Sequence, residues 1–470
     1  MVLETFDAIV IGAGQAGPSL AARCGQSGMK VALVERHLLG GTCVNTGCYP
    51  TKTLVASARA MHLARRGEEF GFEAGPVRVD MQRVMARMNS IVDSARAGME
   101  SWVRGMQGVE WITGHARFTS ARTVRIGERE LQAGKIFIDV GARAARPPLE
   151  GLDKVTALDN ASVLRLQEVP KHLLIVGGSY IGLEFAQLMR RFGAEVSVVE
   201  RSPRLLPRED ADVAAEVQAI LEREGVRFHL ASECMAFAPG ASGVRMRARC
   251  EPHDEWLEGS HVLLAMGRTP NTGDLGLEAA GVRMDGRGFI EVDDQCRTSA
   301  EGIWALGECN GRGAFTHTAW NDHEIVAANV LDGEERSLRD RLPCYALFMD
   351  PPLGRAGMSE QEVRAAGRPA LVGKRSMERV GRATEAGETQ GFMKVLVDAQ
   401  TRKILGASIL GLAGDEVVHV LLDAMAAGTT ATELARTMHI HPTVSELVPT
   451  LLQELRELEG SSPSIHSGAK

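Results

Sequence analysis

Cys43 and Cys48 are the two residues of this chain whose type and spacing most directly suggest chemistry. Two thiols this close along a chain can form a disulfide that opens and closes by thiol–disulfide exchange. Pro50 and a helical pattern follow Cys48, which predicts that this thiol lies at or near the start of a helix. The helix dipole and the free N–H groups there stabilise a thiolate and lower the pKa of the thiol. The pair is therefore the first candidate for a redox centre.

The alternative is two unrelated buried thiols, because cysteine is commonly buried. We give that interpretation to the other six cysteines: Cys24, Cys234, Cys250, Cys296, Cys309 and Cys344. A zinc site would need a closer pair of cysteines and further ligands, which the segment 43–48 does not supply. We therefore expect no metal at this pair.

Length and charge limit the class of protein. A chain of 470 residues exceeds what one hydrophobic core normally supports, so several domains are expected. The formal net charge of −7 and the pI of about 6.1 give no reason to expect nucleic acid as a partner. No stretch approaches the roughly 20 apolar residues that cross a bilayer, and the first residues lack the pattern of a signal peptide. We therefore expect a cytoplasmic protein with no membrane partner, where a disulfide is more often catalytic than structural.

The elements that position the pair begin with a glycine-rich turn. A buried strand leads into a turn that contains Gly12, Gly14 and Gly17, and the strand after the next helix ends at Glu35. The first glycine permits a tight turn, the second lets a pyrophosphate approach the backbone, and the third lets the helix pack on the strand. The carboxylate can accept hydrogen bonds from a ribose. The pattern predicts a dinucleotide site.

The same pattern occurs a second time. Gly177, Gly182 and Glu200 each stand 165 residues after the corresponding residue of the first turn. Ser179 replaces the middle glycine, and its side chain could hold a pyrophosphate slightly farther from the backbone. Two coincidences at one offset are improbable, so we predict two dinucleotide sites.

The rest of the chain predicts further elements. Residues 110–140 alternate apolar and polar, which indicates a small antiparallel meander, and residues 262–267 and 303–307 are buried strands that end in glycine. From residue 341 onward the pattern changes to strands followed by helices, with a last helix over 445–458. This indicates a separate α+β domain.

The run from Gly41 to Lys52 resembles the redox-active segment of the flavoprotein disulfide reductases, which include dihydrolipoamide dehydrogenase, glutathione reductase and mercuric reductase. The resemblance extends over essentially the whole chain. It implies an α/β fold of two Rossmann-like dinucleotide-binding domains plus a C-terminal α+β dimerisation domain. The implied division is 1–150 and 273–340 for two parts of an FAD-binding domain, 151–272 for an NAD(P)-binding domain and 341–470 for the dimerisation domain.

The resemblance also implies cofactor contacts. The run 303–309 resembles the family's second FAD motif, with Glu308, one methylene longer, in place of the aspartate that binds the ribityl chain. The runs 138–141 and 264–271 resemble the two crossovers between domains, and Val140 stands where the first crossover usually has threonine. The implied FAD-binding residues are Gly12, Gly14, Gly17, Glu35, Gly41, Thr42, Gly141 and Glu308. Those implied for the nicotinamide dinucleotide are Gly177, Tyr180, Gly182, Glu200, Arg201 and Gly267.

Cofactor choice depends on Glu200. A carboxylate at the end of that strand accepts hydrogen bonds from a free ribose 2′-OH and repels a 2′-phosphate. We therefore predict NADH as the electron donor, although Arg201 and Arg204 lie close enough in sequence to reverse part of this preference and leave NADPH possible.

Three further residues take roles from the resemblance. Lys52 corresponds to a lysine beside flavin N5, and Glu184 to its ion-pair partner on the nicotinamide side. An ammonium there can stabilise negative charge that develops on a reduced flavin. Tyr180 matches a tyrosine that covers the flavin in some members and swings away for the nicotinamide, and the alternative is that Tyr180 only packs.

The segment 438–446 resembles the family's His-Pro-Thr signature. Two histidines beside a proline, followed by an acid, suggest an imidazole oriented by a carboxylate. In the family the histidine that matches His441 is the acid–base of the dithiol, the acid that matches Glu446 holds it, and the histidine enters the active site from the other subunit. The resemblance therefore implies a C2 homodimer. His439 matches a histidine of dihydrolipoamide dehydrogenases, and packing explains it equally well.

The electron acceptor stays open among several classes. The His-x-His-Pro-Thr pattern and Glu200 favour a small lipoamide-like disulfide, whereas the runs 311–317 and 350–360 resemble members that reduce metal ions or reactive oxidants. Mercuric reductases carry a C-terminal cysteine pair, and the tail 460–470 has no cysteine, so mercuric reduction should be poor. A transhydrogenase that needs no cysteines and a non-catalytic redox sensor are weaker alternatives.

Overall fold

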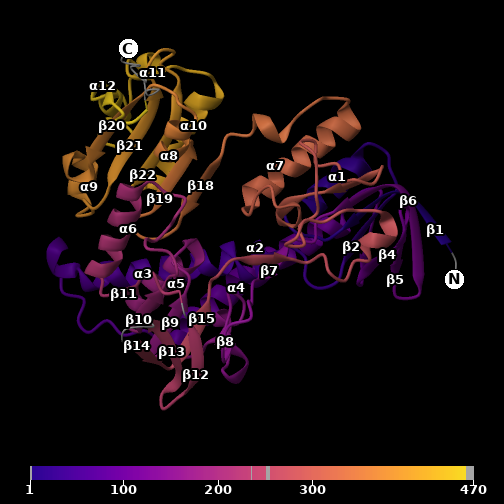
Figure 1. The fold of residues 1–470 in the computed structure, drawn as a ribbon, viewed down its shortest axis with the longest axis horizontal. Coiled ribbons are helices and arrows are strands. Elements are labelled where there is room, and N and C mark those ends of the chain that lie inside the picture. Colours follow the sequence, from indigo (N-terminus) through magenta and orange to yellow (C-terminus); the bar gives the residue numbers. More distant parts are fainter. Residues whose placement is uncertain (1–2, 234, 250–254, 462–470) are drawn as a thin grey trace, which may run out of the picture.

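The computed structural model describes residues 3–233, 235–249 and 255–461. It contains three main β-sheets; of the two redox-cysteine helices, α2 (Gly41–Thr46) lies between the first two sheets and α3 (Cys48–Arg65) packs beside α5 (Tyr180–Phe192) of the second (Figure 1). Among these residues no helix is both long and apolar enough to span a bilayer.

The first sheet has the strand order β3-β2-β1-β6-β5-β4, with β17 also paired to β6. Its strands are β1 (Leu3–Ile11), β2 (Val31–Glu35), β3 (Val109–Thr113), β4 (Ala116–Ser120), β5 (Thr123–Ile126), β6 (Arg129–Ile138) and β17 (Ile303–Ala305). The helices associated with it are α1 (Gly17–Gln26), α2 (Gly41–Thr46), α3 (Cys48–Arg65), α4 (Met81–Arg104) and α7 (Thr316–Ala327). The parallel neighbours of β1 are β2 and β6, so the first glycine turn opens at the carboxyl edge of the sheet.

The prediction of one antiparallel meander over 110–140 is wrong for its first strand. β3 runs parallel to β2, and only β4, β5 and β6 form the meander. The reason is the long helix α4, which returns the chain to the starting side of the sheet and thereby makes β3 the end of a crossover.

The second sheet is parallel, in the order β11-β10-β9-β15-β8. Its strands are β8 (Ala157–Leu158), β9 (His172–Val176), β10 (Glu195–Val199), β11 (Arg227–His229) and β15 (His261–Leu264), accompanied by α5 (Tyr180–Phe192) and α6 (Ala211–Arg223). A separate antiparallel sheet joins β12 (Ala236–Gly240), β13 (Gly243–Arg249) and β14 (Glu255–Gly259). The two crossover segments pair with each other as β7 (Ala142–Ala144) and β16 (Arg268–Pro270).

The third sheet, β18-β19-β22-β21-β20-β23, forms the C-terminal part of the chain. Its strands are β18 (Cys344–Leu347), β19 (Leu353–Gly357), β20 (Ala370–Ser376), β21 (Phe392–Asp398), β22 (Ile404–Leu410) and β23 (Arg456–Glu457). Its helices are α8 (Glu360–Ala365), α9 (Gly381–Glu385), α10 (Gly414–Ala426), α11 (Ala431–Leu434) and α12 (Leu447–Gln453). The predicted last helix, 445–458, is too long at both ends. At its C-terminal end the reason is that Arg456 and Glu457 pair with β20 and take their backbone hydrogen bonds from a sheet edge.

Short helices complete the chain. They are η1 (Gly67–Phe70), η2 (Leu152–Lys154), η3 (Val163–Arg165), η4 (Leu277–Ala280), η5 (Gly307–Asn310), η6 (Ala328–Asp332), η7 (Leu338–Asp340) and η8 (Met377–Arg379), of which η6 is a π-helix.

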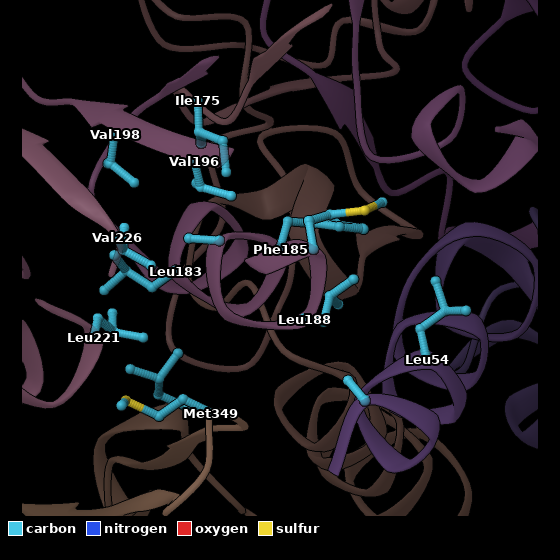
Figure 2. Packing of buried hydrophobic residues seen from close by; sticks show 14 of the residues in the cluster. Leu54, Ile175, Leu183, Phe185, Leu188, Val196, Val198, Leu221, Val226 and Met349 are labelled. Atoms are coloured by element: carbon cyan, nitrogen blue, oxygen red, sulfur yellow. The ribbon is translucent and has the colours of Figure 1, made fainter. Parts of the chain in front are cut away.

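Helix α5 is at the centre of the largest apolar core. Figure 2 shows its Leu183 and Leu188 among side chains from three parts of the chain, which include Ile175 on β9, Leu54 on α3 and Met349 after β18. All five side chains are buried. This packing holds the redox-cysteine helix α3 against the helix that follows the second glycine turn.

A buried ion cluster joins α6, α8 and β21. The ammonium of Lys394, whose residue is 1% exposed, lies 2.7 Å from Asp210 Oδ2, 2.6 Å from Asp212 Oδ1 and 2.8 Å from Glu360 Oε1. The spacing of these three acids would suit a metal ion, but the ammonium of Lys394 lies among them. Burial lowers the pKa of Lys394, yet the carboxylates, Asp210 first, raise it above its ordinary value.

We expect Lys394→Met to lower the free energy of unfolding by about 3 kcal/mol, because it leaves buried carboxylates without a partner. Denaturant unfolding followed by fluorescence measures the change. Lys374→Met is the matched control, since Lys374 is about one-third exposed and binds the same Asp212, and a partly exposed pair contributes less than about 1 kcal/mol. Equal destabilisation by the two variants would contradict the role of the buried cluster.

Candidate functional site

The two glycine turns have the same geometry. Gly12 has φ +105° and Gly177 has φ +112°, a region that side chains other than glycine rarely adopt. A Cβ atom on Gly17 would lie 2.1 Å from Gly12 O, and one on Gly182 would lie 2.1 Å from Gly177 O. Only glycine lets each helix start so close to its strand. Both turns therefore fit the cradle of a dinucleotide pyrophosphate.

The two predicted ribose carboxylates are also held alike. Glu35 accepts hydrogen bonds from Ala13 N and His37 N, both at 2.8 Å. Glu200 accepts from Gly178 N at 2.6 Å and from Ser202 N at 2.7 Å. Each carboxylate thus joins its glycine turn to the backbone two residues further along the chain.

Ser179, which replaces the middle glycine, has extended backbone with φ −116°. Since no positive φ is required there, a serine fits without backbone strain. Arg201 has an exposed side chain beside Glu200, whereas Arg204 donates to Pro207 O at 2.8 Å.

The two cysteines lie on consecutive helices that a single residue connects. Cys43 is in α2, and α3 begins at Cys48, which confirms the predicted helix start. Both side chains are half-buried thiols. Gly47 joins the helices, and a Cβ there would lie 2.9 Å from Thr42 O. This close turn is what brings the thiols together.

The protonation of the pair is uneven. A hydrogen bond from Cys43, with help from Thr316 and the charge of Lys52, outweighs burial and lowers the pKa of Cys48 to about 6. The same hydrogen bond, together with burial, raises the pKa of Cys43 well above its ordinary value. The reduced pair therefore holds a thiolate on Cys48 and a proton on Cys43 at neutral pH.

Thr316 is a contact that the sequence did not predict. Its Oγ1 lies 3.4 Å from Cys48 Sγ, and it is the first residue of α7. The 268 residues between them leave no signal in sequence spacing, although Thr316 lies inside a run that the resemblance had singled out.

Lys52 and Glu184 form the predicted ion pair. Lys52 Nζ lies 2.7 Å from Glu184 Oε2, and the same ammonium is 4.5 Å from the centroid of the Phe348 ring. Glu184 Oε1 accepts a hydrogen bond from Phe348 N at 3.0 Å. Lys52 lies one helical turn after Cys48 on α3, so the two side chains share a face of the helix. The buried carboxylate of Glu184 holds the ammonium in place there.

Tyr180 lies in an aromatic cluster. Its ring makes edge contacts with Phe315 and Tyr345, at centroid distances of 6.0 and 5.4 Å. The hydroxyl groups of Tyr180 and Tyr345 both donate to Glu209 Oε1, at 3.3 and 2.6 Å. The structure thus gives Tyr180 packing partners and a specific hydrogen bond.

Glu308 has a partner that the sequence did not reveal. Arg268 Nε lies 2.6 and 2.8 Å from its two carboxylate oxygens, and the Arg268 guanidinium also reaches Thr42 Oγ1 at 3.4 Å. Burial raises the pKa of Glu308, and Arg268 opposes that rise. Gly141, with φ +61°, and Gly267, with φ +101°, lie beside the paired crossover strands.

His441 and Glu446 are brought together as the sequence predicts. His441 Nδ1 lies 2.8 Å from Glu446 Oε2, and the imidazole is 81% exposed. Both residues lie between α11 and α12, which Figure 1 shows at the far end of the C-terminal sheet from α2. His439 Nδ1 instead lies 3.1 Å from Thr437 O. Within one chain, therefore, the imidazole and the cysteines are apart.

Two dinucleotide cradles beside a thiol pair define a nucleotide-linked thiol oxidoreductase. The model of the pyridine nucleotide-disulphide oxidoreductase family matches residues 6–322, and that of the family's dimerisation domain matches residues 344–452. The chain belongs to the pyridine nucleotide-disulphide oxidoreductases.

Its relatives differ in activity. A probable pyridine nucleotide-disulfide oxidoreductase, RclA, from Escherichia coli is 34% identical over 94% of this chain and 98% of its own. Dihydrolipoyl dehydrogenase 3 from Pseudomonas aeruginosa is 35% identical, over 95% of this chain and 97% of its own length. Mercuric reductase from Streptomyces lividans is 32% identical, over 95% of this chain and 96% of its own length. The solved structure of the HOCl-induced flavoprotein disulfide reductase RclA from E. coli has a TM-score of 0.87 at 33% identity, and covers 95% of this chain and 99% of that one.

The family depends on FAD and uses NAD(P)H as the electron donor. The first glycine turn fits FAD, because the backbone leaves no room for a Cβ at Gly12 or Gly17 and the Glu35 carboxylate is bonded to the turn through Ala13 N. The chain is therefore an enzyme of the flavoprotein disulfide reductase fold.

We expect the anaerobic addition of NADH to produce a long-wavelength thiolate-to-flavin absorption band that fades as the pH falls through about 6. The lowered pKa keeps Cys48 ionised above that pH, and protonation below it removes the thiolate. Cys48→Ser should lose the band, and Thr316→Val should move its midpoint to higher pH because the thiolate loses a hydrogen bond.

Thr318→Val is the control for this titration, since the Thr318 hydroxyl bonds the backbone of Phe315. An unchanged band in Cys48→Ser would refute the assignment of the thiolate.

Proposed function

We propose that this protein reduces small, lipoamide-like disulfides with electrons from NADH, which pass through FAD to the Cys43–Cys48 disulfide. The observation that carries the proposal is the 2.8 Å contact between His441 and Glu446. Breaking a substrate disulfide releases a thiolate, and an imidazole oriented by a carboxylate is suited to protonate it. Reduction of a metal ion needs no such acid.

The roles of the cysteines follow from their unequal protonation. Bound FAD would supply the two-electron chemistry that links the nicotinamide to the disulfide, and the residues of the first glycine turn would hold it. Cys48 is the sulfur assigned to the flavin side, because its lowered pKa suits a stable thiolate. Cys43 keeps its proton, so it becomes nucleophilic only when a base such as His441 removes that proton.

The substrate half-reaction is balanced by the dithiol. Cys43 thiolate attacks one sulfur of the substrate, which forms a mixed disulfide, and the departing thiolate takes a proton from His441. Cys48 thiolate then attacks Cys43 Sγ, which restores the Cys43–Cys48 disulfide and releases the second thiolate. Two electrons leave the dithiol, and the substrate disulfide gains them.

Lys52, Glu184 and Tyr180 are proposed to serve the flavin. The Lys52 ammonium, held by Glu184, would stabilise negative charge near flavin N5. Tyr180 would cover the flavin and move when the nicotinamide binds. Glu308 would approach the ribityl chain with its charge matched by Arg268.

We further propose a homodimer in which His441 serves the cysteines of the other subunit. The family's dimerisation domain matches residues 344–452, and the segment that carries His441 is exposed, with Met438 at 95% and Ile440 at 80%. Exposed apolar side chains of this size suit a subunit interface. A homodimer would bring the imidazole to the thiol pair.

A second candidate is the reduction of metal ions or reactive oxidants. It is favoured by the likeness to the HOCl-induced reductase RclA. The solved Cu(II) complex of RclA also resembles this chain, with a TM-score of 0.87. Thiolates are soft ligands that suit copper, so the Cys43–Cys48 pair could also serve this reaction.

His441→Ala separates the two candidates. We expect it to lower kcat/KM for lipoamide or another small disulfide by about 10²–10⁴-fold, the usual contribution of general acid–base catalysis, and to leave NADH-dependent Cu(II) reduction within about threefold of the wild type. Steady-state NADH oxidation in the presence of each acceptor measures both. His439→Ala is the matched control and should retain disulfide reduction.

A wild-type enzyme that turns over Cu(II) or hypohalous oxidants but no disulfide would replace the first candidate with the second. Equal loss with both kinds of acceptor would contradict the acid role of His441.

Glu200→Gln tests the choice of donor. Wild-type enzyme should prefer NADH, because a carboxylate held at the second turn repels a 2′-phosphate, and the variant should improve kcat/KM for NADPH by about tenfold, which corresponds to about 1.4 kcal/mol. Glu195→Gln, an exposed change at the start of the same strand, is the control. An unaltered ratio of NADH to NADPH activity in Glu200→Gln would contradict this assignment.

A further inference from the structure

Asp139 is a buried carboxyl group between the two FAD motifs. It follows β6 and is 6% exposed. Its Oδ2 accepts a hydrogen bond from Gly17 N at 2.8 Å, at the start of α1. A Cβ on Gly14 would lie 3.0 Å from Oδ2, and one on Gly307 would lie 2.9 Å from Oδ1. One side chain therefore contacts the first glycine turn and the glycine before Glu308.

The second dinucleotide site supplies an internal comparison. Asp139 N donates to Ile11 O at 2.7 Å, and Ala265 N donates to Val176 O at 2.8 Å in the same register. Glycines face these two residues alike, since a Cβ on Gly12 would lie 2.2 Å from Asp139 O and one on Gly177 would lie 2.4 Å from Ala265 O. A turn of this shape therefore forms over an alanine in the second site, and of the two sites only the first has an acid, Asp139, at this position.

The groups that face Asp139 are mostly acidic. They are Glu35 from β2, Asp322 from α7 and the Cys309 thiol from η5, while the amides of Ala16 and Gly17 face Asp139 at the start of α1. The guanidinium of Arg341 is bonded to Asp322.

Burial raises the pKa of Asp139 to about 8, the Gly17 amide opposes the rise, and Asp322 and Glu35 add to it. The carboxyl is therefore largely protonated at neutral pH, and its Oδ2 can still accept the Gly17 hydrogen bond.

We propose that Asp139 is a determinant of FAD affinity. As a neutral acid beneath the first turn it permits the pyrophosphate to bind, and when it ionises it weakens FAD binding. The pyrophosphate is expected at the glycine turn and the start of α1, where amide groups and the helix dipole favour negative charge. An ionised Asp139 competes for those amides and repels the pyrophosphate. The proposal depends on FAD binding at the first turn and not on the identity of the electron acceptor.

The way in which FAD affinity changes with pH follows from the raised pKa of Asp139. Bound FAD brings more negative charge and holds the proton on Asp139 more firmly, so FAD binding takes up a proton when the free protein is ionised. Affinity is then constant below about pH 8 and falls as the pH rises above it.

The test is the release of FAD from diluted holoenzyme, followed by the fluorescence of the free cofactor at pH 7 and pH 9. We expect the wild-type dissociation constant to be about tenfold larger at pH 9, because about one-tenth of a group with a pKa near 8 stays protonated there. Asp139→Asn keeps the shape and the acceptor for Gly17 N, and should bind FAD equally at both pH values. Asp139→Ala, which copies Ala265, should also be insensitive to pH.

Asp332→Asn is the matched control, since Asp332 is an exposed acid that pairs with Arg23 on the same helix α1. It should retain the wild-type dependence on pH. A pH-independent wild type, a tenfold rise that persists in Asp139→Asn, or loss of FAD from Asp139→Asn at pH 7 would each overturn the proposal. Failure of the wild type to hold FAD at either pH would overturn the cofactor site itself, whereas an inactive but FAD-binding enzyme would leave this inference standing and refute only the proposed reaction.

Discussion

The arrangement around the thiol pair depends on one buried carboxylate, that of Glu184. One of its oxygens binds the ammonium of Lys52 at 2.7 Å, and the other accepts the amide of Phe348. These contacts bring together the helix that begins at Cys48, the helix of the second glycine turn and the segment that follows β18. Loss of Lys52 would leave the buried carboxylate of Glu184 without its counter-charge, which is far more costly than loss of an exposed pair.

The second constraint is the contact of backbone with backbone at the two glycine turns. Gly17 and Gly182 lie so close to the carbonyl groups of Gly12 and Gly177 that no side chain fits. The two halves share this geometry and the hydrogen bonding of their carboxylates, yet they differ beneath the turn, where one has Asp139 and the other Ala265. A duplicated scaffold thus holds two nucleotide sites whose local electrostatics are not the same.

Much of this could be predicted from sequence because the signals are local. The glycine spacing, the acid that ends each second strand, the start of a helix at Cys48 and the neighbouring His441 and Glu446 are all short-range patterns. The predictions that were wrong concerned regions where pairing is decided from a distance. Examples are β3, which joins a parallel sheet because of α4, and β23, which adds to the edge of β20 in place of a longer last helix.

The sequence by itself determined which residue types are present and the local turns that only those types permit, because glycine, proline and helix-capping effects act over a few residues. Only the tertiary structure decided that Thr316 lies against Cys48, that Arg268 faces Glu308 and that Asp139 is buried beneath the first turn. These contacts join segments 40 or more residues apart, up to 268 for Thr316 and Cys48. Their energies come from burial and from charges across packed elements, which a linear pattern does not record.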